Sequence, residues 1–268
     1  MRADLYLTRM GYADSRTLAQ KLIAEGAVTV DGSPIRKPSE EISEGEHTVS
    51  VTATAETRYV GRGGLKLEAA LTAFPVDPHG CVVADIGAST GGFTDCLLQN
   101  GAALVYAVDA GHDQLHPRLL ADSRVRSAEG VNARTLTAET LAAIERSWQE
   151  AHPDLPVSAA PSDGRVDGIV MDVSFISQTL LHPALASVLR EGGWMITLIK
   201  PQFELTRNAL NKQGVVKQEK DRRAALERVL ASAAACGLEA VSVIPSPIEG
   251  GDGNREFLAY LKKPLAGD

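Results

Sequence analysis

From residue 82 onward, short apolar runs alternate with longer amphipathic or polar segments. The apolar runs predict strands over residues 82–86, 104–109, 124–128, 167–172, 193–199, 239–244 and 256–262. Between the third and fourth runs, residues 137–151 have the apolar spacing of an amphipathic helix, followed by a Pro-, Ser- and Ala-rich loop over 153–164. This alternation is typical of a doubly wound α/β sheet.

The first 52 residues follow a different pattern. They predict two short helices over residues 2–10 and 16–25, a strand over 27–30, a tight Asp31-Gly32 turn and a second strand over 48–51. Acidic and polar residues then predict a linker. A basic, glycine-rich segment follows the linker and leads into a predicted helix over residues 65–74. We therefore expect two domains: residues 1–57, linker included, and residues 58–268.

Composition and charge argue against several classes of protein. The three cysteines are odd in number and far apart, with no C-x-x-C or His pairing, which argues against a disulfide framework or a metal site. No apolar run approaches the ~20 residues of a membrane span, and the charged N-terminus is unlike a signal peptide. We therefore expect a cytoplasmic protein with neither a membrane nor a metal partner. The formal charge of −7 argues against indiscriminate nucleic-acid binding.

Residues 200–223 depart from this acidity, with a local charge balance of +4. The cations are Lys200, Arg207, Lys212, Lys217, Lys220, Arg222 and Arg223, and the anions are Glu204, Glu219 and Asp221. Two interpretations remain open at this point: a surface that faces phosphates, or a solvated helix start with its loop.

The chain is organised around residues 82–93, V-V-A-D-I-G-A-S-T-G-G-F. An apolar run that ends in a carboxylate and a glycine-rich turn predicts a buried parallel strand leading to the start of a helix. Side chains larger than hydrogen at Gly87, Gly91 or Gly92 would hold a ligand away from the backbone. The spacing lacks the G-x-G-x-x-G dehydrogenase fingerprint. Asp109, at the end of the next strand, is placed to accept hydrogen bonds from ribose hydroxyls.

This turn and Asp109 together resemble the S-adenosylmethionine site of class I methyltransferases, although an unrelated α/β protein could carry such a turn. The resemblance implies S-adenosylmethionine as cofactor. It assigns contacts with the amino acid portion to Asp85, Gly87, Ala88, Ser89, Thr90, Gly91, Gly92 and Phe93, contact with the ribose to Asp109, and contact with the adenine edge to Asn132.

Polar groups also follow other predicted strands, at the edge where open α/β sheets bind ligands. Asp172 and Lys200 end two strands, and Glu256 opens the last one. In a methyltransferase sheet that strand runs antiparallel, so its start lies at the same edge. With Lys66 from the first helix of this domain, four charged residues are expected to converge on one cleft.

The Lys-Asp-Lys-Glu order resembles that of the FtsJ-like ribose 2′-O-methyltransferases. The N-terminal order of helix, Ser-Arg helix and G-x-V-x-V-D-G resembles the S4-type RNA-binding domain. Together with G-R-G-G-L-K-L, D-V-S-F-I-S, L-I-K-P-Q-F-E and G-N-R-E-F, these features resemble the TlyA family, often labelled haemolysins. FtsJ proper has an Asp where this chain has Asn132, and a proline in its glycine loop where this chain has Ser89-Thr90.

The TlyA resemblance implies S-adenosylmethionine-dependent 2′-O-methylation of a cytidine in ribosomal RNA, with ribosomal RNA or ribosomal subunits as partner. In this family, shorter members act on large-subunit RNA only and longer members act on both subunits. Because this chain lacks terminal extensions, we expect the shorter type, with action on both subunits as the alternative. Phosphate contacts are assigned to Arg2, Arg16, Lys21, Arg36, Lys37, Arg58 and Arg62, while the opposing interpretation is a solvated face balanced by nearby acids.

The chemistry can be argued from the residue types. A ribose hydroxyl is a poor nucleophile, so its site must stabilise a developing alkoxide and take its proton. A lysine with a pKa near ~10.4 cannot accept that proton unless its pKa falls, as it does beside a second ammonium. We expect Lys66 and Lys200 to be close together, with Lys200 nearest the hydroxyl as base or alkoxide stabiliser. We expect Asp172 to bridge them, and Glu256 to orient Lys66 or the ribose.

Other functions fit these residues less well. Each of the four residues alone has an ordinary explanation, such as a helix cap or a surface charge. An RNA-binding protein without catalysis would keep the N-terminal unit but would not need all four charged residues. A membrane-active haemolysin would need a spanning or strongly amphipathic segment, and none is found in the sequence.

Overall fold

The computed structural model describes residues 1–13, 15–43, 45–52, 58–155, 163–250, 253–265 and 267. The end of the predicted linker (53–57) and most of the predicted 153–164 loop lie outside these residues. The chain divides into two compact units, Met1–Tyr59 and Val60–Asp268, and each is described by itself.

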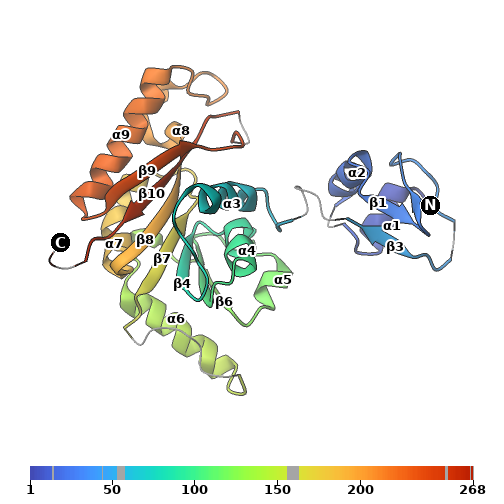
Figure 1. Cartoon of the computed structure of the whole chain (residues 1–268), viewed down its shortest axis with the longest axis horizontal. Helices are drawn as coiled ribbons and strands as arrows, with labels where there is room; N and C mark the ends of the chain where they lie inside the picture. The colour runs from blue at the N-terminus through green and yellow to red at the C-terminus, as the bar shows by residue number, and fades with distance from the viewer. Residues whose placement is uncertain are drawn as a thin grey trace. The chain divides into compact units, whose positions relative to one another are not determined.

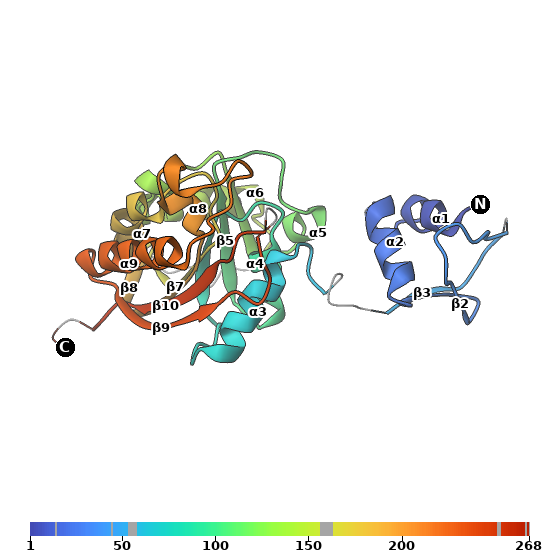
Figure 2. The same cartoon turned by 90° about the horizontal axis from the view of Figure 1, so that it is seen from above.

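The N-terminal unit consists of two helices, α1 (Ala3–Arg9) and α2 (Arg16–Ala24), and a small antiparallel sheet. Its strands are β1 (Val28–Val30), β2 (Ser33–Pro34) and β3 (Val49–Val51), in the order β2-β1-β3. Figure 2 shows both helices on one side of this sheet. The core is formed by apolar residues that recur at helical and strand spacing, among them Leu7, Leu22, Ile23 and Val28, each at most 1% exposed.

Local chemistry fixes the ends of these elements. The Ser15 hydroxyl accepts a hydrogen bond from the Leu18 amide (3.2 Å), so it caps α2 as its residue type predicts. Asp31 and Gly32 have φ of 51° and 76°, the two positive values that a two-residue hairpin turn requires. The Asp31 carboxylate also accepts a hydrogen bond from the Thr48 amide. The turn is therefore tied to the strand that closes the sheet.

The larger unit contains a seven-stranded sheet in the order β6-β5-β4-β7-β8-β10-β9. Its strands are β4 (Val82–Ile86), β5 (Leu104–Asp109), β6 (Val125–Glu129), β7 (Val166–Met171), β8 (Leu189–Ile199), β9 (Glu239–Pro245) and β10 (Phe257–Lys262). The first five pair in parallel, whereas β10 is antiparallel to both β8 and β9. The predicted α/β fold is confirmed, and β8 begins before the predicted residue 193.

Helices cover both faces of this sheet (Figure 1). The α-helices are α3 (Gly63–Ala73), α4 (Gly92–Gln99), α5 (Pro117–Leu120), α6 (Ala138–Ala151), α7 (His182–Val188), α8 (Pro201–Glu204) and α9 (Glu219–Ala235), and the 3₁₀ turns are η1 (Ala133–Thr135), η2 (Gln178–Leu180) and η3 (Arg207–Ala209). The helices α3 and α4 contact each other, and Figure 2 shows α7 and α9 on the opposite face of the sheet from α3. Every residue of β4 is buried, Asp85 included, as the apolar residues around that carboxylate predict.

The antiparallel last strand has a direct consequence for the site. Phe257 pairs with Ile199, so the start of β10 lies beside the end of β8. Glu256 and Lys200 immediately flank this pair in the sequence. The two residues therefore meet at the same edge of the sheet as the carboxyl ends of β4, β5 and β7, where ligands of open α/β sheets bind.

Candidate active site

The loop between β4 and α4 depends on glycine at two positions. Gly87 and Gly91 have φ of 81° and 95°, a region that other residues rarely adopt. A Cβ on Gly87 would lie 2.7 Å from the Asp172 carbonyl oxygen, and one on Gly91 would lie 2.2 Å from Leu119 Cδ1. The loop therefore presents bare backbone on one side and packs against its neighbours on the other. Ser89 also has a positive φ of 47°.

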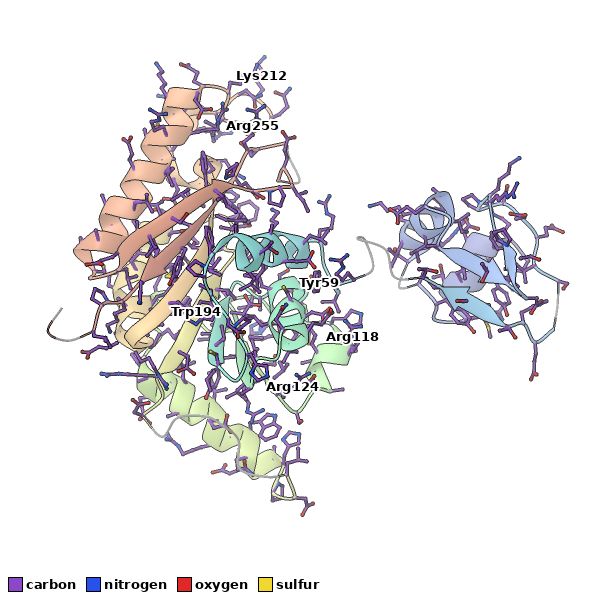
Figure 3. All side chains as sticks on the ribbon, viewed as in Figure 1. Tyr59, Arg118, Arg124, Trp194, Lys212 and Arg255 are labelled. Carbon is purple, nitrogen blue, oxygen red and sulfur yellow. The ribbon has the colours of Figure 1, made fainter. Side chains whose placement is uncertain are left out.

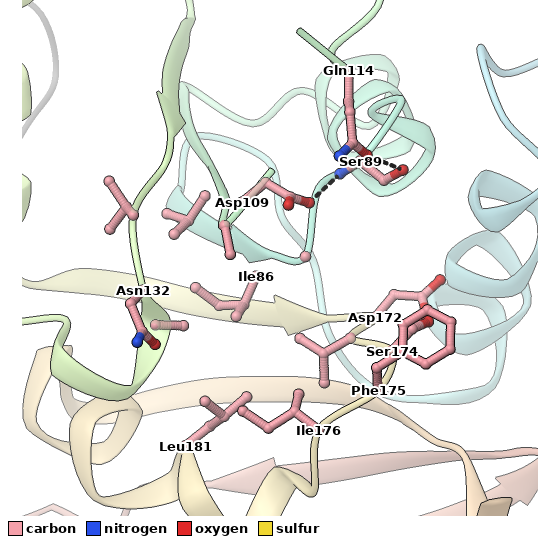
Figure 4. Close-up of a pocket in the computed structure, with 16 residues that line it drawn as sticks. Ile86, Ser89, Asp109, Gln114, Asn132, Asp172, Ser174, Phe175, Ile176 and Leu181 are labelled. Atoms are coloured by element: carbon pink, nitrogen blue, oxygen red, sulfur yellow. Dashed lines mark hydrogen bonds between the residues drawn. The ribbon is translucent and has the colours of Figure 1, made fainter. Parts of the chain in front are cut away.

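Asp109 holds this loop in place. One carboxylate oxygen accepts a hydrogen bond from the Ser89 amide (2.8 Å) and the other accepts one from the Gly111 amide (2.7 Å). The Ser89 hydroxyl donates to the side chain of Gln114 at 3.1 Å, as Figure 4 shows. A carboxylate with two oxygens has further lone pairs available, so these bonds leave Asp109 able to accept from a ligand hydroxyl.

A cavity of about 390 Å³ opens beside the loop, within the size range of ligand sites. Gly87, Ser89 and Asp109 line it, together with Asn132 and Phe175. In Figure 4, Asn132 lies at the far side of the cavity from Phe175. The Asn132 Oδ1 accepts a hydrogen bond from the Arg134 amide, which fixes the orientation of the side chain.

A second cavity of about 220 Å³ adjoins the first, since both are lined by Gly87, Ser89, Asp172 and Ser174. Its remaining lining comes from the predicted loop residues Ala88, Thr90, Gly92 and Phe93, from Gly61, Arg62 and Gly63, and from Lys200. The predicted cofactor loop is thus joined through one shared wall to two of the four predicted catalytic residues, Asp172 and Lys200, whereas Lys66 and Glu256 line neither cavity.

Asp85 lies beneath the loop and lines neither cavity. Its side chain is fully buried, one oxygen accepts a hydrogen bond from the Thr94 hydroxyl (2.7 Å), and the other has no hydrogen-bond partner in the described part of the chain. Burial raises the pKa of this carboxyl to about 7, and the charge of Asp172 contributes in the same direction. An uncompensated acceptor of this kind below a ligand loop is suited to a cationic group above it.

The four charged residues form two separate ion pairs. Lys66 Nζ lies 2.5 Å from Glu256 Oε2, with the two side chains 11% and 2% exposed. Lys200 Nζ lies 2.6 Å from Asp172 Oδ1 and donates to the Ser174 hydroxyl at 2.8 Å. Asp172 therefore pairs with Lys200, and no ion pair of Asp172 with Lys66 occurs among the described residues. The expected bridge between the two lysines is thus replaced by one carboxylate for each.

The helix α3 brings the two pairs to the same place. A Cβ on Gly63 would lie 3.6 Å from Asp172 Oδ2, an ordinary contact distance, so the start of α3 lies directly beside Asp172. Lys66 follows three residues later and shares that face of the helix. A cation near a helix start is opposed by the macrodipole. Glu256 supplies the compensating charge, because its carboxylate contacts Lys66 directly.

Two residues of this site were missed by the sequence argument. Ser174 receives the Lys200 hydrogen bond, and Phe175 stands 90% exposed at the cavity with φ of 64°. A non-glycine residue in this conformation is rare, and a large exposed aromatic is rarer still. The Phe203 ring lies 5.1 Å away at 54°, so Phe175 is supported on one side. The sequence feature that could have identified them is their position two and three residues after Asp172, at the end of a parallel strand.

The N-terminal cations predicted to bind RNA fall into two groups. Arg2 and Arg16 both bond to the Asp4 carboxylate at 3.0 Å, and Gln20 bonds to it at 2.8 Å. Hydrogen bonds from Arg2 and Gln20 hold the pKa of the Asp4 carboxyl well below its usual range. The arginine side chains remain 48% and 54% exposed. This arrangement brings two of the predicted cations together.

The other predicted cations lie apart from that pair. Arg36 and Lys37 are exposed on a turn whose amides donate to Glu40, and Lys21 is exposed on α2. Arg58 is an exposed residue near the end of the N-terminal unit. Arg62 belongs to the larger unit, where it is the N-cap residue of α3 and lines the second cavity.

Two features are absent from the described residues. No helix in this part of the chain is both long and apolar enough to span a bilayer. No group of three or more His, Cys, Asp or Glu residues within it is arranged to hold a metal ion.

Comparison with known proteins agrees with this geometry. Residues 59–263 match the family model of FtsJ-like methyltransferases, and residues 1–47 match that of the S4 domain. The chain is 37% identical to the 16S/23S rRNA (cytidine-2′-O)-methyltransferase TlyA of Mycobacterium tuberculosis, over 97% of this chain and 89% of the relative. It is equally identical to Hemolysin A of Brachyspira hyodysenteriae, over 97% and 99%. A solved structure of a hemolysin candidate from Streptococcus thermophilus is 39% identical over 98% of this chain and 88% of that one, with a TM-score of 0.69.

Proposed function

The chain belongs to the FtsJ-like methyltransferase family and carries an S4 domain, so it is an S-adenosylmethionine-dependent enzyme; we propose that it methylates the 2′-hydroxyl of a cytidine in ribosomal RNA. The activity of its Mycobacterium tuberculosis relative supports this substrate, as does that of a Campylobacter jejuni relative, a 23S rRNA (cytidine-2′-O)-methyltransferase that is 31% identical. Its partners are then ribosomal subunits, of which we favour the large one, and its place of action is the cytoplasm.

We assign the cofactor to the 390 Å³ cavity. Gly87 lines this cavity without a side chain, Asp109 is available to ribose hydroxyls, and Asn132 lines the far side (Figure 4), where we place the adenine edge. Thr90, Gly92 and Phe93 complete the loop on the side of the second cavity. The uncompensated Asp85 carboxylate below the loop favours the positive charge of the cofactor's amino acid portion. When bound, S-adenosylmethionine supplies an electrophilic methyl group.

The single observation that carries the proposal is the position of Lys200. Its ammonium lines the second cavity, beside the wall shared with the cofactor cavity, and is held there by Asp172 and Ser174. A positioned ammonium stabilises the negative charge that develops on an attacking oxygen. We assign Lys200 Nζ as the group next to the ribose 2′-hydroxyl and Asp172 as the residue that positions it.

The Lys66–Glu256 pair is assigned a structural role in this arrangement. Both side chains are nearly fully buried, so they are poorly placed to contact a large substrate. We assign them the role of fixing α3 and the start of β10 around the Lys200–Asp172 pair. Such support matters because a displacement of about 1 Å in a reacting group can cost on the order of 100-fold in rate.

Two surface features favour RNA as the substrate. Phe175 exposes its ring at the rim of the cavity, and single-stranded nucleotides are recognised by stacking on such rings. In the N-terminal unit, the shared Asp4 carboxylate holds Arg2 and Arg16 close together with other N–H groups still free, which suits phosphate oxygens. A base methyltransferase would instead need a [DN]-P-P-[YF] turn or a Pro-Cys nucleophile, which the sequence lacks.

The test is methyl transfer from tritiated S-adenosylmethionine to unmodified ribosomal subunits, followed by mapping of the labelled nucleotide. We expect label on a cytidine ribose. Lys200→Met should lower transfer by about 10²- to 10⁴-fold while cofactor affinity, measured by calorimetry, stays within about twofold. Label on a base, or a Lys200→Met enzyme with near-normal turnover, would refute the assignment.

A further inference from the structure

A short hairpin follows the Lys200 strand end and has an unusual charge. Residues 206–217, T-R-N-A-L-N-K-Q-G-V-V-K, contain three cations and no acid. The cations are Arg207, Lys212 and Lys217, and all three are exposed. The chain as a whole carries a net charge of −7. The 206–217 hairpin is therefore a local reversal of the protein's overall charge.

The 206–217 hairpin is internally ordered. Leu210 and Val216 form an antiparallel bridge, and the Asn211 backbone amide donates a hydrogen bond to the Val215 carbonyl oxygen at 3.0 Å. The Asn211 side-chain oxygen also accepts from the amides of Gln213 (2.9 Å) and Val215 (2.8 Å). A turn whose backbone groups are satisfied in this way holds its side chains in a defined place.

A buried residue anchors the 206–217 hairpin to the active-site edge. Asn254 is only 1% exposed, and it accepts a hydrogen bond from the Val216 amide (3.0 Å) while it donates one to the Gly214 carbonyl (3.1 Å). Glu256 lies two residues further along. At the other end, the hairpin follows α8, whose N-cap residue is Lys200. The hairpin is therefore tied to both strands that supply catalytic charges.

The acid that follows the hairpin is paired with an arginine outside it. Glu219 is held by Arg222 at 2.6 Å, and Arg222 also donates to the carbonyls of Val216 and Lys217. Arg255 is 71% exposed and only 3.9 Å from Glu249. Figure 3 shows Lys212 and Arg255 at the same end of this unit. The side chain of Lys212 lines a cavity of about 500 Å³ with Arg207 and Asn211.

We infer that the 206–217 hairpin, together with Arg255, binds the phosphate backbone of the RNA beside the target nucleotide. This inference rests on the proposed function, which it deepens. Lysine and arginine next to phosphates release counterions, so each contact adds to affinity and to its salt dependence. The anchoring by Asn254 means that the bound backbone is held in a fixed position relative to Lys200 and Glu256.

The test compares two double variants that remove equal charge from opposite edges of the sheet. Lys212→Gln/Lys217→Gln neutralises the hairpin, and these side chains make no hydrogen bond or ion pair within the described residues, so the fold should persist. Arg165→Gln/Lys262→Gln is the matched control, since Arg165 precedes β7 and Lys262 ends the antiparallel β10. Both control residues are exposed at the edge away from the site.

Two assays are needed, methyl transfer and direct retention of labelled ribosomal RNA on a filter at several salt concentrations. For the hairpin variant we expect Kd and KM for RNA to rise roughly 10-fold, and the slope of log K against log salt to fall by about 1.4 to 1.8. The kcat and the affinity for S-adenosylmethionine should stay unchanged. The control variant should change Kd by less than about twofold.

The outcomes separate this inference from the proposed function. If the wild type transfers methyl groups and the hairpin variant binds RNA like the control variant, the inference is wrong and the function stands. If no methyl transfer occurs but the hairpin variant alone loses RNA affinity, the function is wrong and the surface stands. If the wild type binds no RNA, both are overturned.

Discussion

The buried Lys66–Glu256 ion pair permits a stability prediction with a definite sign. The two charges are 2.5 Å apart and the side chains are 11% and 2% exposed. At an effective dielectric constant of about 20, their attraction is roughly 6 to 7 kcal/mol, which is offset by the cost of taking both charges out of water. Removing one partner leaves the other buried without compensation, and this typically costs about 3 to 5 kcal/mol.

We therefore expect Lys66→Met and Glu256→Leu each to destabilise the larger unit by about 3 to 5 kcal/mol. For a unit of this size the melting temperature should fall by roughly 6 to 20 °C. The double variant replaces the pair with apolar side chains of similar volume, so its stability should return to within about 1 to 2 kcal/mol of the wild type. Methyl transfer should be impaired in all three.

The natural tryptophans provide the assay. Trp148 and Trp194 are the only two in the sequence, and both belong to the larger unit. Their fluorescence during urea unfolding therefore reports on that unit without interference from the S4 domain. Additive effects of the two substitutions, with the double variant the least stable of the three, would refute the reasoning, because coupled partners must show non-additive free energies.

Three further predictions concern the loop and two buried titratable groups. Gly87→Ala should abolish S-adenosylmethionine binding in calorimetry, since its Cβ would lie 2.7 Å from the Asp172 carbonyl. The control Gly80→Ala, with a similar φ of 71° but open space around it, should keep its cofactor affinity. Equal losses of affinity in the two variants would contradict this prediction. Burial raises the pKa of Asp85 to about 7, so the free energy of unfolding of the unliganded protein should fall by up to about 4 kcal/mol as pH rises from about 4 to 7. In Asp85→Asn, the free energy measured by urea unfolding should no longer depend on pH in this range. Burial lowers the pKa of His182 to about 4, so the free energy of unfolding should fall by up to about 3 kcal/mol as pH drops from 6.5 towards 4. If His182→Gln lost stability equally between pH 6.5 and 4, His182 would not be the cause.

The helices and strands of the larger unit could be predicted because the conformation that each segment favours locally is the one that it adopts in the folded sheet. The apolar residues on both faces of β4 require burial, and the glycines after it require a close approach, so both features were evident from residue types alone. The same holds for the Asp31-Gly32 turn, whose positive φ values suit these residues. These features could be predicted because each residue type involved favours a single local conformation or environment.

The pairing of the charged residues could not be predicted in the same way. Sequence order places Asp172 and Lys200 at strand ends, but the choice of partner depends on where α3 enters the site. The register of β10 brings Glu256 to this edge of the sheet, where Glu256, and not Asp172, pairs with Lys66. Phe175 was missed for a related reason, because a backbone conformation of φ 64° is imposed by its surroundings and not by its own residue type.

The antiparallel last strand also decides when during synthesis the enzyme becomes active. A growing chain that has emerged only as far as β8 already contains the cofactor loop, Asp172 and Lys200. It lacks the carboxylate that neutralises Lys66, which arrives only at residue 256. Unfinished or prematurely terminated chains should therefore not methylate RNA, even where they still bind S-adenosylmethionine.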